Sequence, residues 1–267
     1  MNGLELLSKA IEQYKPVAVY GLFSGGHDSL TATHVAAQHP AFTAAVHINT
    51  GIGIEQTRQF VRATCERQTW PLKEYRAEDC GQVYRDIVVQ HGFPGPMGHL
   101  FMYSRLKERA LRKLIRETKT EFKDKVLLVT GVRSQESQRR MGHVEPIQVD
   151  GAKVWCAIIH DWSKRDCNDY IEANQLPRNE VVDLIHMSGE CLCGAFAHPG
   201  ELNEIELWFP ETAAKIRQIE AEVKEVGHCW GWEEKPPYTR KKAPDKRQMM
   251  LCYGCIHNQA AVFGGEG

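Results

Sequence analysis

The sequence predicts an α/β protein with an open, mostly parallel sheet, helices on both faces, and a small helical unit at the C-terminal end. Short apolar runs rich in β-branched residues alternate with stretches of helical periodicity, which is the pattern of strand–helix–strand units. Glycine turns directly follow two of the apolar runs. We therefore expect an α/β domain over 1–190 and a cysteine-rich helical unit packed on it over 191–267.

The elements alternate along the chain as this fold class requires. Apolar, β-rich runs predict strands at Val17–Phe23, Phe42–Ile48, Leu72–Tyr75, Lys125–Thr130 and Lys153–Ile159. Apolar residues at helical spacing predict helices at Leu4–Gln13, Ser29–Gln38, Glu55–Arg67, Asp79–Gln90, Leu100–Thr118, Lys164–Ala173, Glu201–Trp208 and Pro210–Val226.

The bulk composition excludes several classes of protein. Of the 267 residues, 42% are hydrophobic and 25% are charged, and the formal net charge is -1. Such a chain has no global basic field that would draw it onto nucleic acid. No apolar run reaches membrane-spanning length and the first residues lack a signal-peptide pattern, so we expect a cytoplasmic protein without a membrane partner. Nine cysteines in a reducing compartment favour metal, cluster or thiol chemistry over a disulfide framework.

The first glycine turn, Ser24–Ser29, joins a predicted strand directly to a predicted helix. The start of a helix offers unpaired backbone N–H groups and the positive end of its dipole, which suits a phosphate. Gly25 and Gly26 permit close approach, and the two serines add hydroxyl donors. The spacing fits neither a Walker A loop nor a G-x-G-x-x-G fingerprint. The Gly-Gly pair alone also fits a plain strand-to-helix turn.

The whole string S-G-G-H-D-S after an apolar strand resembles the pyrophosphate loop (PP-loop) of the ATP pyrophosphatases, in particular of the phosphoadenosine phosphosulfate (PAPS) reductase family. The resemblance implies an adenine nucleotide α-hydrolase-like sheet and a bound adenine nucleotide, either ATP or PAPS/APS. It implies phosphate contacts along the loop, with Asp28 capping the helix or holding Mg²⁺. His27 stands where relatives often have Lys or Phe, and its side chain would contact phosphate or point to solvent. The residues implied to hold the nucleotide here are Ser24, Gly25, Gly26, His27, Asp28 and Ser29.

A second glycine turn, with Asn49, Thr50 and Gly51, follows the next predicted strand. On spacing alone it is a plain strand-to-helix connection. The resemblance implies a contact with the adenosine part of the nucleotide, because relatives typically carry a D-T-G-I-like turn here. Asn49 stands where Asp is common, so a polar cap remains but a charge is lost.

Three basic residues are expected to stabilise negative charge during the reaction. Arg133 and Arg139 lie in G-V-R-S-Q-E-S-Q-R-R after the apolar strand Lys125–Thr130. An arginine side chain can bind phosphate or sulfate through two parallel hydrogen bonds. This string resembles the family's G-x-R-x-x-E-S-x-R-R; an exposed, charged helix start is the plain alternative. Lys107 lies in a basic helix where G-F-P…R-L-K resembles the family's G-F-P…C-T-x-x-L-K, although Met102-Tyr103 replaces Cys-Thr. Its plain alternative is a solvated helix face.

A later run, from Asp161 to Asn179, resembles the family's D-W-T…Y-I…L-P-x-N segment. Within it, Trp162 and Tyr170 are predicted to be core anchors rather than site residues.

Two close cysteine pairs predict a metal site. Cys191 and Cys193 form a C-x-C pair in S-G-E-C-L-C-G, and Cys252 and Cys255 form a C-x-x-C pair. Four thiolates suit tetrahedral zinc or an iron–sulfur cluster, and four unliganded buried thiols are the plain alternative. Several relatives carry a 4Fe–4S cluster between such pairs, so the resemblance favours a 4Fe–4S cluster over zinc.

Three functions fit these motifs. The favoured one cleaves ATP to AMP and pyrophosphate and thereby activates an acceptor for sulfur transfer, because S-G-E-C-L-C-G resembles the sulfur-activating subunit of DNA phosphorothioation systems. That resemblance implies a sulfur-donor protein such as a cysteine desulfurase, a nucleic-acid acceptor and a homodimer. The second is a sulfonucleotide (PAPS/APS) reductase, which the lack of an E-C-G-L-H-like string counts against. The third is a non-catalytic nucleotide-binding scaffold with a structural metal site.

Overall fold

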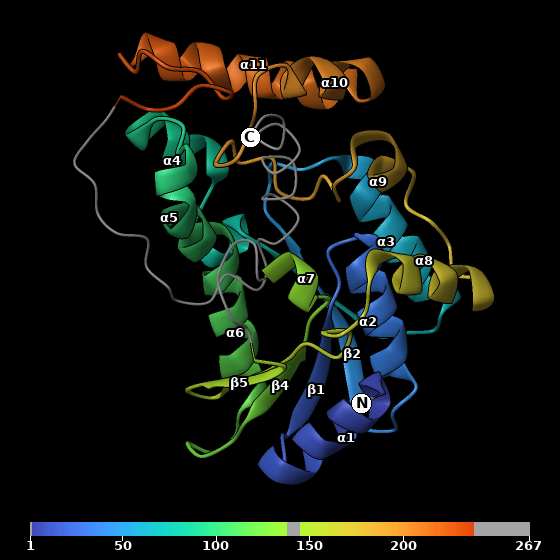
Figure 1. The fold of residues 1–267 in the computed structure, drawn as a ribbon. Helices are drawn as coiled ribbons and strands as arrows, with labels where there is room; N and C mark the ends of the chain where they lie inside the picture. Colours follow the sequence, from blue (N-terminus) through green and yellow to red (C-terminus); the bar gives the residue numbers. More distant parts are fainter. Residues whose placement is uncertain (1, 138–144, 238–267) are drawn as a thin grey trace, which may run out of the picture. The chain divides into compact units, whose positions relative to one another are not determined.

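The computed structural model describes residues 2–137 and 145–237 (Figure 1). Arg139, Cys252 and Cys255 lie outside the described residues, and their roles stay predictions. Within the described part of the chain, no helix combines the length and apolar character needed to cross a membrane.

The chain divides into two compact units whose segments alternate in the sequence. Unit 1 runs to Ile48 and resumes over Thr57–Tyr75 and Leu111–Glu180. Unit 2 comprises Asn49–Gln56 and Arg76–Ala110, and it continues from Val181. The predicted boundary at residue 190 stays a prediction, because compactness does not test which part folds by itself.

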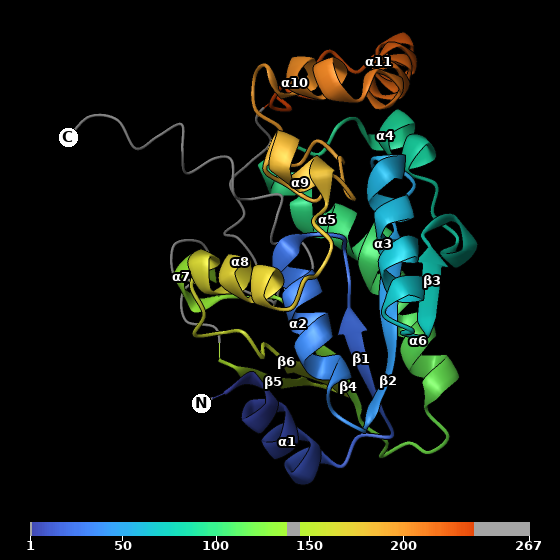
Figure 2. The ribbon, with the colours of Figure 1, turned by 90° about the vertical axis from the view of Figure 1, so that its right-hand side faces the viewer.

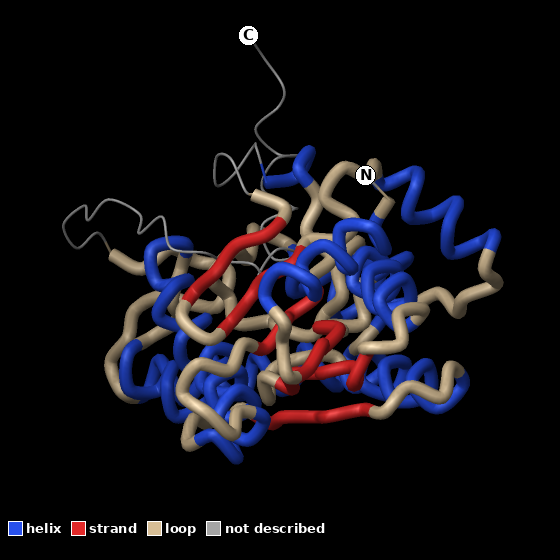
Figure 3. Tube along the Cα trace, turned by 90° about the horizontal axis from the view of Figure 1, so that it is seen from below, coloured by secondary structure: helices blue, strands red, loops and turns tan. Residues whose placement is uncertain are grey.

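Unit 1 is built on a six-stranded sheet in the order β3-β2-β1-β4-β6-β5. The strands, drawn in red in Figure 3, are β1 (Ala18–Leu22), β2 (Phe42–Asn49), β3 (Leu72–Arg76), β4 (Val126–Val129), β5 (Ile147–Asp150) and β6 (Lys153–Cys156). β1 pairs in parallel with β2 and β4, β4 pairs in parallel with β6, and β5 is an antiparallel edge strand. The predicted mostly parallel sheet is confirmed, and the edge strand β5 is an addition that the sequence did not predict.

Helices cover both faces of this sheet, which is why β1 and β4 are buried along their whole lengths. Val19 of β1 belongs to a core with α1 (Gly3–Tyr14), α2 (His27–Ala37) and α8 (Lys164–Ala173) (Figure 2). The next residue, Tyr20, points to the other face, where its hydroxyl lies 3.0 Å from Thr118 Oγ1 at the end of α6 (Arg109–Thr118). Helix α3 (Glu55–Arg67) packs with α2 and β2.

The strand order reverses direction between β1 and β4. From β1 the sheet continues through β2 to β3 on one side, and through β4 to β6 on the other. In open parallel sheets the crevice outside the carboxyl ends of the strands at such a switch point is where ligands bind. The turn after β1 and the loop after β4 are therefore the places to look for a site in unit 1.

Unit 2 is mainly helical. Its segments are a 3₁₀ turn at Glu78–Cys80, α4 (Tyr84–His91), a 3₁₀ turn at Pro96–Gly98, α5 (His99–Tyr103), a π-helical segment at Ser104–Glu108, α9 (Glu180–Ile185), α10 (Glu201–Trp208) and α11 (Pro210–Glu225). Helix α11 buries the predicted face, which consists of Ala213, Ile216, Ile219 and Val223.

Two helix predictions were wrong in detail. The predicted helix Leu100–Thr118 is α5, the π-helical segment and α6 in succession. The predicted helix Asp79–Gln90 starts only at Tyr84, because Gly81, with φ +81°, ends the 3₁₀ turn before it. The short helix α7 (Ser134–Ser137) follows β4 in unit 1.

Candidate functional site

The turn from β1 into α2 has the form of an anion site. Gly26 occupies the N-cap position of α2, with extended backbone angles, and no described side chain caps the helix there. Helix α2 has 11 residues, so its first N–H groups and its dipole both favour a negative ligand. Because Gly26 is the cap residue, Asp28 lies inside the first turn and not at the cap position.

Hydroxyl groups hold this turn in shape. The Ser29 hydroxyl donates to the Gly26 carbonyl at 2.8 Å and accepts the Ser24 backbone N–H at 3.3 Å. The two serine hydroxyls lie 3.2 Å apart. Ser29, which we expected to be a phosphate donor, therefore orders the loop through its proton, while the Ser24 hydroxyl lies beside it.

Contacts at Gly25 also hold the loop in place. This glycine has φ +83°, and a Cβ there would lie 2.5 Å from Thr57 Cγ2, so the position requires glycine. Its carbonyl accepts a hydrogen bond of 2.9 Å from Asn179 Nδ2, which also lies 3.3 Å from Thr57 Oγ1. Asn179 is only 2% exposed. Sequence reasoning missed this residue, although the L-P-x-N resemblance was the signal that could have found it.

The loop after β4 meets the start of α2, as both predicted anion motifs require. Arg133 Nε donates to Asp28 Oδ2 at 3.1 Å, with side-chain exposures of 3% and 27% respectively. A Cβ on Gly131 would lie 2.6 Å from the Asp28 backbone carbon, so the two loops are in close contact. The structure thus brings Asp28 and Arg133 together as an ion pair next to the uncapped helix end.

His27 is a buried neighbour of this pair. Its side chain is 6% exposed, which makes the solvent-facing alternative wrong. Its Nδ1 lies 3.4 Å from a terminal nitrogen of Arg178, directly before Asn179. The phosphate contact predicted for His27 stays a prediction.

The second glycine turn belongs to unit 2, and its groups are engaged by the protein itself. Asn49 Oδ1 accepts the Gly51 N–H at 3.0 Å. The Thr50 N–H donates to Glu190 Oε1 at 2.9 Å, and the Thr50 hydroxyl donates to the Glu190 carbonyl at 2.6 Å. The Gly51 carbonyl accepts a 2.8 Å hydrogen bond from Lys215 of α11.

Lys107 and His99 form a buried basic pair within unit 2. Lys107 lies in the π-helical segment and is buried, so the solvated-face alternative is wrong for this residue. π-Helical insertions occur frequently at functional sites. Burial, with the Lys107 charge adding to it, lowers the pKa of His99 to about 4. His99 is therefore a neutral imidazole at pH 7.

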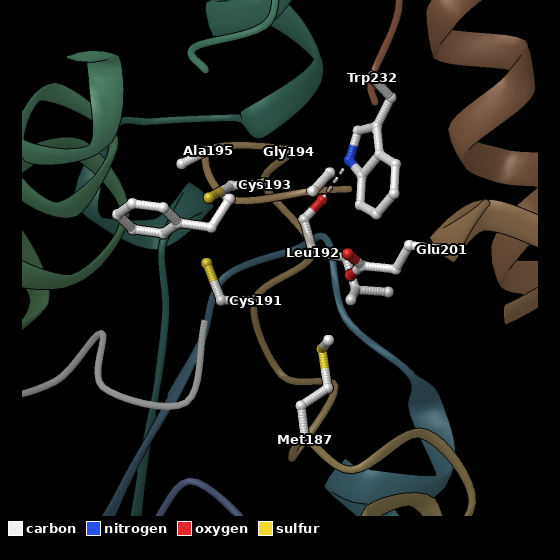
Figure 4. Close-up of a pocket in the computed structure, with 10 residues that line it drawn as sticks. Met187, Cys191, Leu192, Cys193, Gly194, Ala195, Glu201 and Trp232 are labelled. Atoms are coloured by element: carbon white, nitrogen blue, oxygen red, sulfur yellow. Dashed lines mark hydrogen bonds between the residues drawn. The ribbon is translucent and has the colours of Figure 1, made fainter. Parts of the chain in front are cut away.

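The C-x-C pair lines a small pocket of unit 2 (Figure 4). Cys191 is half-buried and Cys193 is buried. Figure 4 shows their sulfur atoms on the same side of the pocket. The Trp232 indole donates to the Leu192 carbonyl at 2.8 Å and fixes the residue between them. Among the described residues there is no group of three side chains able to hold a metal ion.

Two titratable groups beside this pocket have pKa values above their usual ranges. Burial, reinforced by the two cysteines, raises the pKa of Tyr84 well above its usual range, and its hydroxyl donates to the Cys193 carbonyl at 3.2 Å. Burial likewise raises the pKa of Glu201, which lines the pocket, to about 7. The cavity has a volume of about 20 Å³, which holds a water-sized sphere and not a nucleotide.

The predicted site residues are thus distributed over both units. Unit 1 brings together the loop Ser24–Ser29 and Arg133, and it adds Asn179. Unit 2 contains Asn49–Gly51, Lys107 and the C-x-C pair. The part in unit 1 can bind an anion by backbone N–H groups next to a guanidinium, and the part in unit 2 carries thiols.

Comparisons with solved structures agree with this fold. A crystal structure of phosphoadenylyl-sulfate (PAPS) reductase from Candida auris, a phosphate complex, aligns with a TM-score of 0.52 at 18% identity and covers 69% of this chain and 85% of that chain. An FMN adenylyltransferase from Candida glabrata, in complex with FAD and inorganic pyrophosphate, aligns with a TM-score of 0.44 at 14% identity over 65% of this chain and 55% of that chain. The first likeness shows the fold, and the second is too weak to carry an argument.

Comparisons of sequence give the family. A search of curated proteins found no match. The family model described as the phosphoadenosine phosphosulfate reductase domain matches residues 18–188, which begin at β1 and include both glycine turns, Arg133 and Asn179. This span is more than half of the chain, and the chain therefore belongs to the phosphoadenosine phosphosulfate reductase domain family.

Proposed function

We propose that the protein is a PP-loop enzyme that cleaves ATP to AMP and pyrophosphate and so activates an acceptor for sulfur transfer. The observation that carries the proposal is the uncapped N-terminus of α2 beside Arg133, at the switch point of a parallel sheet. This arrangement offers backbone donors and a buried guanidinium to a phosphate chain without any covalent nucleophile. Transfer at phosphorus needs positioning and charge stabilisation more than covalent chemistry from the protein.

The reaction would proceed by displacement at the α-phosphorus. An oxygen of the acceptor forms the new bond, and pyrophosphate leaves with the electron pair of the broken bond, which gives an adenylated acceptor. AMP leaves when a sulfur nucleophile then displaces it from the acceptor; where water takes the place of the acceptor, the first displacement gives AMP directly. The N–H groups of the Ser24–Ser29 loop hold the phosphates, Arg133 and Lys107 offset the negative charge that develops, and Arg139 is a further candidate in the same motif. Asn49, Thr50 and Gly51 are the candidates for the adenosine contact.

Mg²⁺ fits this site mainly through the nucleotide. Mg²⁺ prefers carboxylates and phosphate oxygens and keeps several waters. The Asp28 carboxylate already carries the Arg133 guanidinium in its 3.1 Å ion pair. We therefore propose that phosphate oxygens of the nucleotide and water supply most of the Mg²⁺ coordination and that Asp28 chiefly orients Arg133.

The thiol site would serve the sulfur step. Cys191 and Cys193 present two thiols to one pocket, which fits half of a four-thiolate set. We propose that Cys252 and Cys255 complete it around a 4Fe–4S cluster, with zinc as the alternative. Bound there, a cluster would supply redox chemistry or thiophilic sulfur binding. The sulfur would come from a donor such as a cysteine desulfurase, and the acceptor would be a nucleic acid.

Release of pyrophosphate from ATP tests the proposal most directly. Anaerobically purified protein is incubated with ATP and Mg²⁺, and pyrophosphate and AMP are quantified together. Asp28→Asn frees Arg133 from its ion pair and is expected to lower turnover on the order of 10²-fold, a typical loss for one electrostatic group. Asp169→Asn, on the exposed side of α8 in the same unit, is the matched control and should keep the wild-type rate.

The outcomes separate the three candidate functions. Equal amounts of AMP and pyrophosphate, lost in Asp28→Asn, support the ATP pyrophosphatase. Sulfite released from PAPS or APS with a thiol reductant, and no pyrophosphate from ATP, would instead assign a sulfonucleotide reductase. ATP binding without either product would leave a nucleotide-binding scaffold and overturn the proposed enzyme.

The metal is tested by its spectrum and its stoichiometry. Iron, zinc and acid-labile sulfide are measured on anaerobic wild-type protein and on Cys252→Ser. Visible absorption with iron and sulfide that is lost in the variant supports the cluster. Zinc alone, or no metal, would overturn it and leave the nucleotide proposal standing.

A further inference from the structure

The turn after β2 is tied to the segment that carries the C-x-C pair, entirely within unit 2. Thr50 makes three hydrogen bonds to Glu190: its N–H donates to the carboxylate at 2.9 Å, and its hydroxyl donates to the backbone carbonyl at 2.6 Å and to the carboxylate at 3.4 Å. Thr50 is fully buried and Glu190 is 3% exposed. Two buried polar residues that are distant in sequence are therefore hydrogen-bonded to each other.

Backbone contacts extend this tie in both directions. The Ile54 N–H donates to the Gly189 carbonyl at 2.9 Å, and the Leu192 N–H donates to the Ile52 carbonyl at 2.7 Å. Between them, Gly53 lies so close to Glu190 that a Cβ would be 2.4 Å from its carbonyl oxygen. The turn and the cysteine segment thus form one hydrogen-bonded piece of backbone.

We propose that Glu190 is a positioning residue that transmits nucleotide occupancy at the turn 49–51 to Cys191 and Cys193. This rests on the proposed function, in which that turn contacts the adenosine. Thr50 stands between two of the expected contact residues, and Glu190 directly precedes Cys191. A displacement of Thr50 must move Glu190 or break the hydrogen bonds between them, and a displacement of Glu190 moves the adjacent thiol.

The part that Glu190 plays is geometric, which gives the proposal a specific signature. The carboxylate is used as an acceptor for a backbone N–H, and a glutamine side chain has an acceptor oxygen at the same place. Glu190→Gln should therefore keep the hydrogen bond from the Thr50 N–H, whereas Glu190→Ala removes it. Thr50→Val has nearly the same shape as the wild type but lacks the hydroxyl, so it breaks the hydrogen bonds of the hydroxyl from the other side.

Site-resolved thiol labelling, followed by mass spectrometry on the full-length protein, tests this proposal. Labelling rates are measured for wild type, Glu190→Ala, Glu190→Gln and Thr50→Val, first without and then with ATP. The exposed Glu225→Ala on α11 is the matched control. ATP affinity is measured in parallel by calorimetry.

Other cysteines serve as internal standards. Cys229 is exposed and should label at the same rate in every variant. Cys156 lies in β6, and burial raises its pKa to about 12, so it reacts only if the sheet of unit 1 opens. Labelling of Cys156 therefore reports general unfolding and separates it from a local change.

The expected result is a local change at the C-x-C pair. Glu190→Ala should raise the labelling rate of Cys191 and Cys193 on the order of tenfold, the effect of one lost buried hydrogen bond, with Cys156 still protected. Thr50→Val should act in the same direction, and Glu190→Gln should stay near wild type. ATP should slow labelling of the pair in wild type and not in Glu190→Ala.

Every other outcome contradicts one part of the proposal. Unchanged labelling in Glu190→Ala, or in Thr50→Val where the alanine variant unfolds, overturns the positioning role. ATP that binds to wild type without slowing labelling overturns the transmission. A changed rate in Glu190→Ala without any ATP binding to wild type keeps the positioning role and overturns the proposed nucleotide function.

Discussion

The two glycine turns that follow β1 and β2 look alike in sequence and differ in how their donors are used. In the turn Ser24–Ser29, the helix cap is a glycine, and no described side chain fills the cap position. In the turn Asn49–Gly51, the N–H of Thr50 already donates to the Glu190 carboxylate. A carboxylate of the protein therefore accepts a backbone N–H in the second turn, whereas no side chain caps the helix in the first.

This difference shows that a glycine turn after a parallel strand is not by itself an anion site. Backbone N–H groups bind a phosphate only where the fold leaves them without an internal acceptor. In the first turn, internal bonds go to the carbonyl groups of Gly25 and Gly26 and use the N–H of Ser24, and they fix its shape. The first turn thus has no side-chain acceptor at its helix cap, and the second is hydrogen-bonded to the cysteine segment.

The largest expected effect is on a matched pair of glycine variants. Gly25→Ala and Gly51→Ala both place alanine at a positive φ, of +83° and +79°, but only the first also meets a Thr57 methyl group at 2.5 Å. We expect Gly25→Ala to lower the free energy of unfolding by about 3 kcal/mol, from strain plus overpacking. Gly51→Ala should cost about 1 kcal/mol. Urea denaturation measures both.

A second-site change checks the cause of that difference. Thr57→Ser removes the methyl group and keeps the hydroxyl near Asn179. It should recover part of the stability lost in Gly25→Ala and have no such effect on Gly51→Ala. Equal costs for the two alanine variants would contradict the claim that the first loop is the more tightly fixed.

The second-largest expected effect is on the stability and ATP affinity of a variant at Asn179, whose side chain holds the first loop in place. Asn179→Asp replaces the amide donor to the Gly25 carbonyl with an acceptor in a buried place, which should cost about 2 kcal/mol of stability. Because the loop loses its support, ATP affinity should fall on the order of tenfold, a free-energy loss of similar size. Calorimetry and urea denaturation give the two values.

Asn168→Asp is the control for this change. Its Oδ1 accepts a hydrogen bond from Arg178, and a carboxylate accepts that bond equally well. Stability and ATP affinity should therefore stay near wild type. An unchanged ATP affinity in Asn179→Asp would show that the loop keeps its shape without this support.

The smallest effect concerns the support of the second turn. Lys215→Ala removes a solvent-exposed hydrogen bond to the Gly51 carbonyl. Exposed contacts of this kind contribute little, so the free energy of unfolding should change by less than about 0.5 kcal/mol. A loss of 2 kcal/mol or more, which is about the size expected for a buried group, would mean that the second turn depends on α11 as strongly as the first depends on Asn179.

The sequence predicted what depends on local pattern. The apolar runs located β1, β2, β4 and β6, because strands buried on both faces read as continuous hydrophobic segments. The edge strand β3 was located as well, although it is only partly buried. The loop Ser24–Ser29 and Arg133 were singled out from short strings that resemble motifs of the family and carry groups suited to anion binding. Each of these signals lies within one short stretch of sequence, so no knowledge of the tertiary fold was needed.

What the sequence did not predict depends on contacts between distant residues. Asn179 acquires its role from Gly25, and Glu190 from Thr50, and neither partner can be read from neighbouring residues. The edge strand β5 is half exposed and short, so it lacks a continuous apolar signal. The π-helical segment has the same composition as the helices around it.

The alternation of the two units along the chain has a consequence for synthesis on the ribosome. The central strand β1 is made early, yet its parallel neighbour β4 begins only at Val126. Until then one edge of an apolar strand has no partner, and unit 1 is finished only when Glu180 has been made. Such late, long-range pairing slows folding and leaves unpaired strand edges exposed to aggregation. The nascent chain should therefore depend on chaperones that cover these edges.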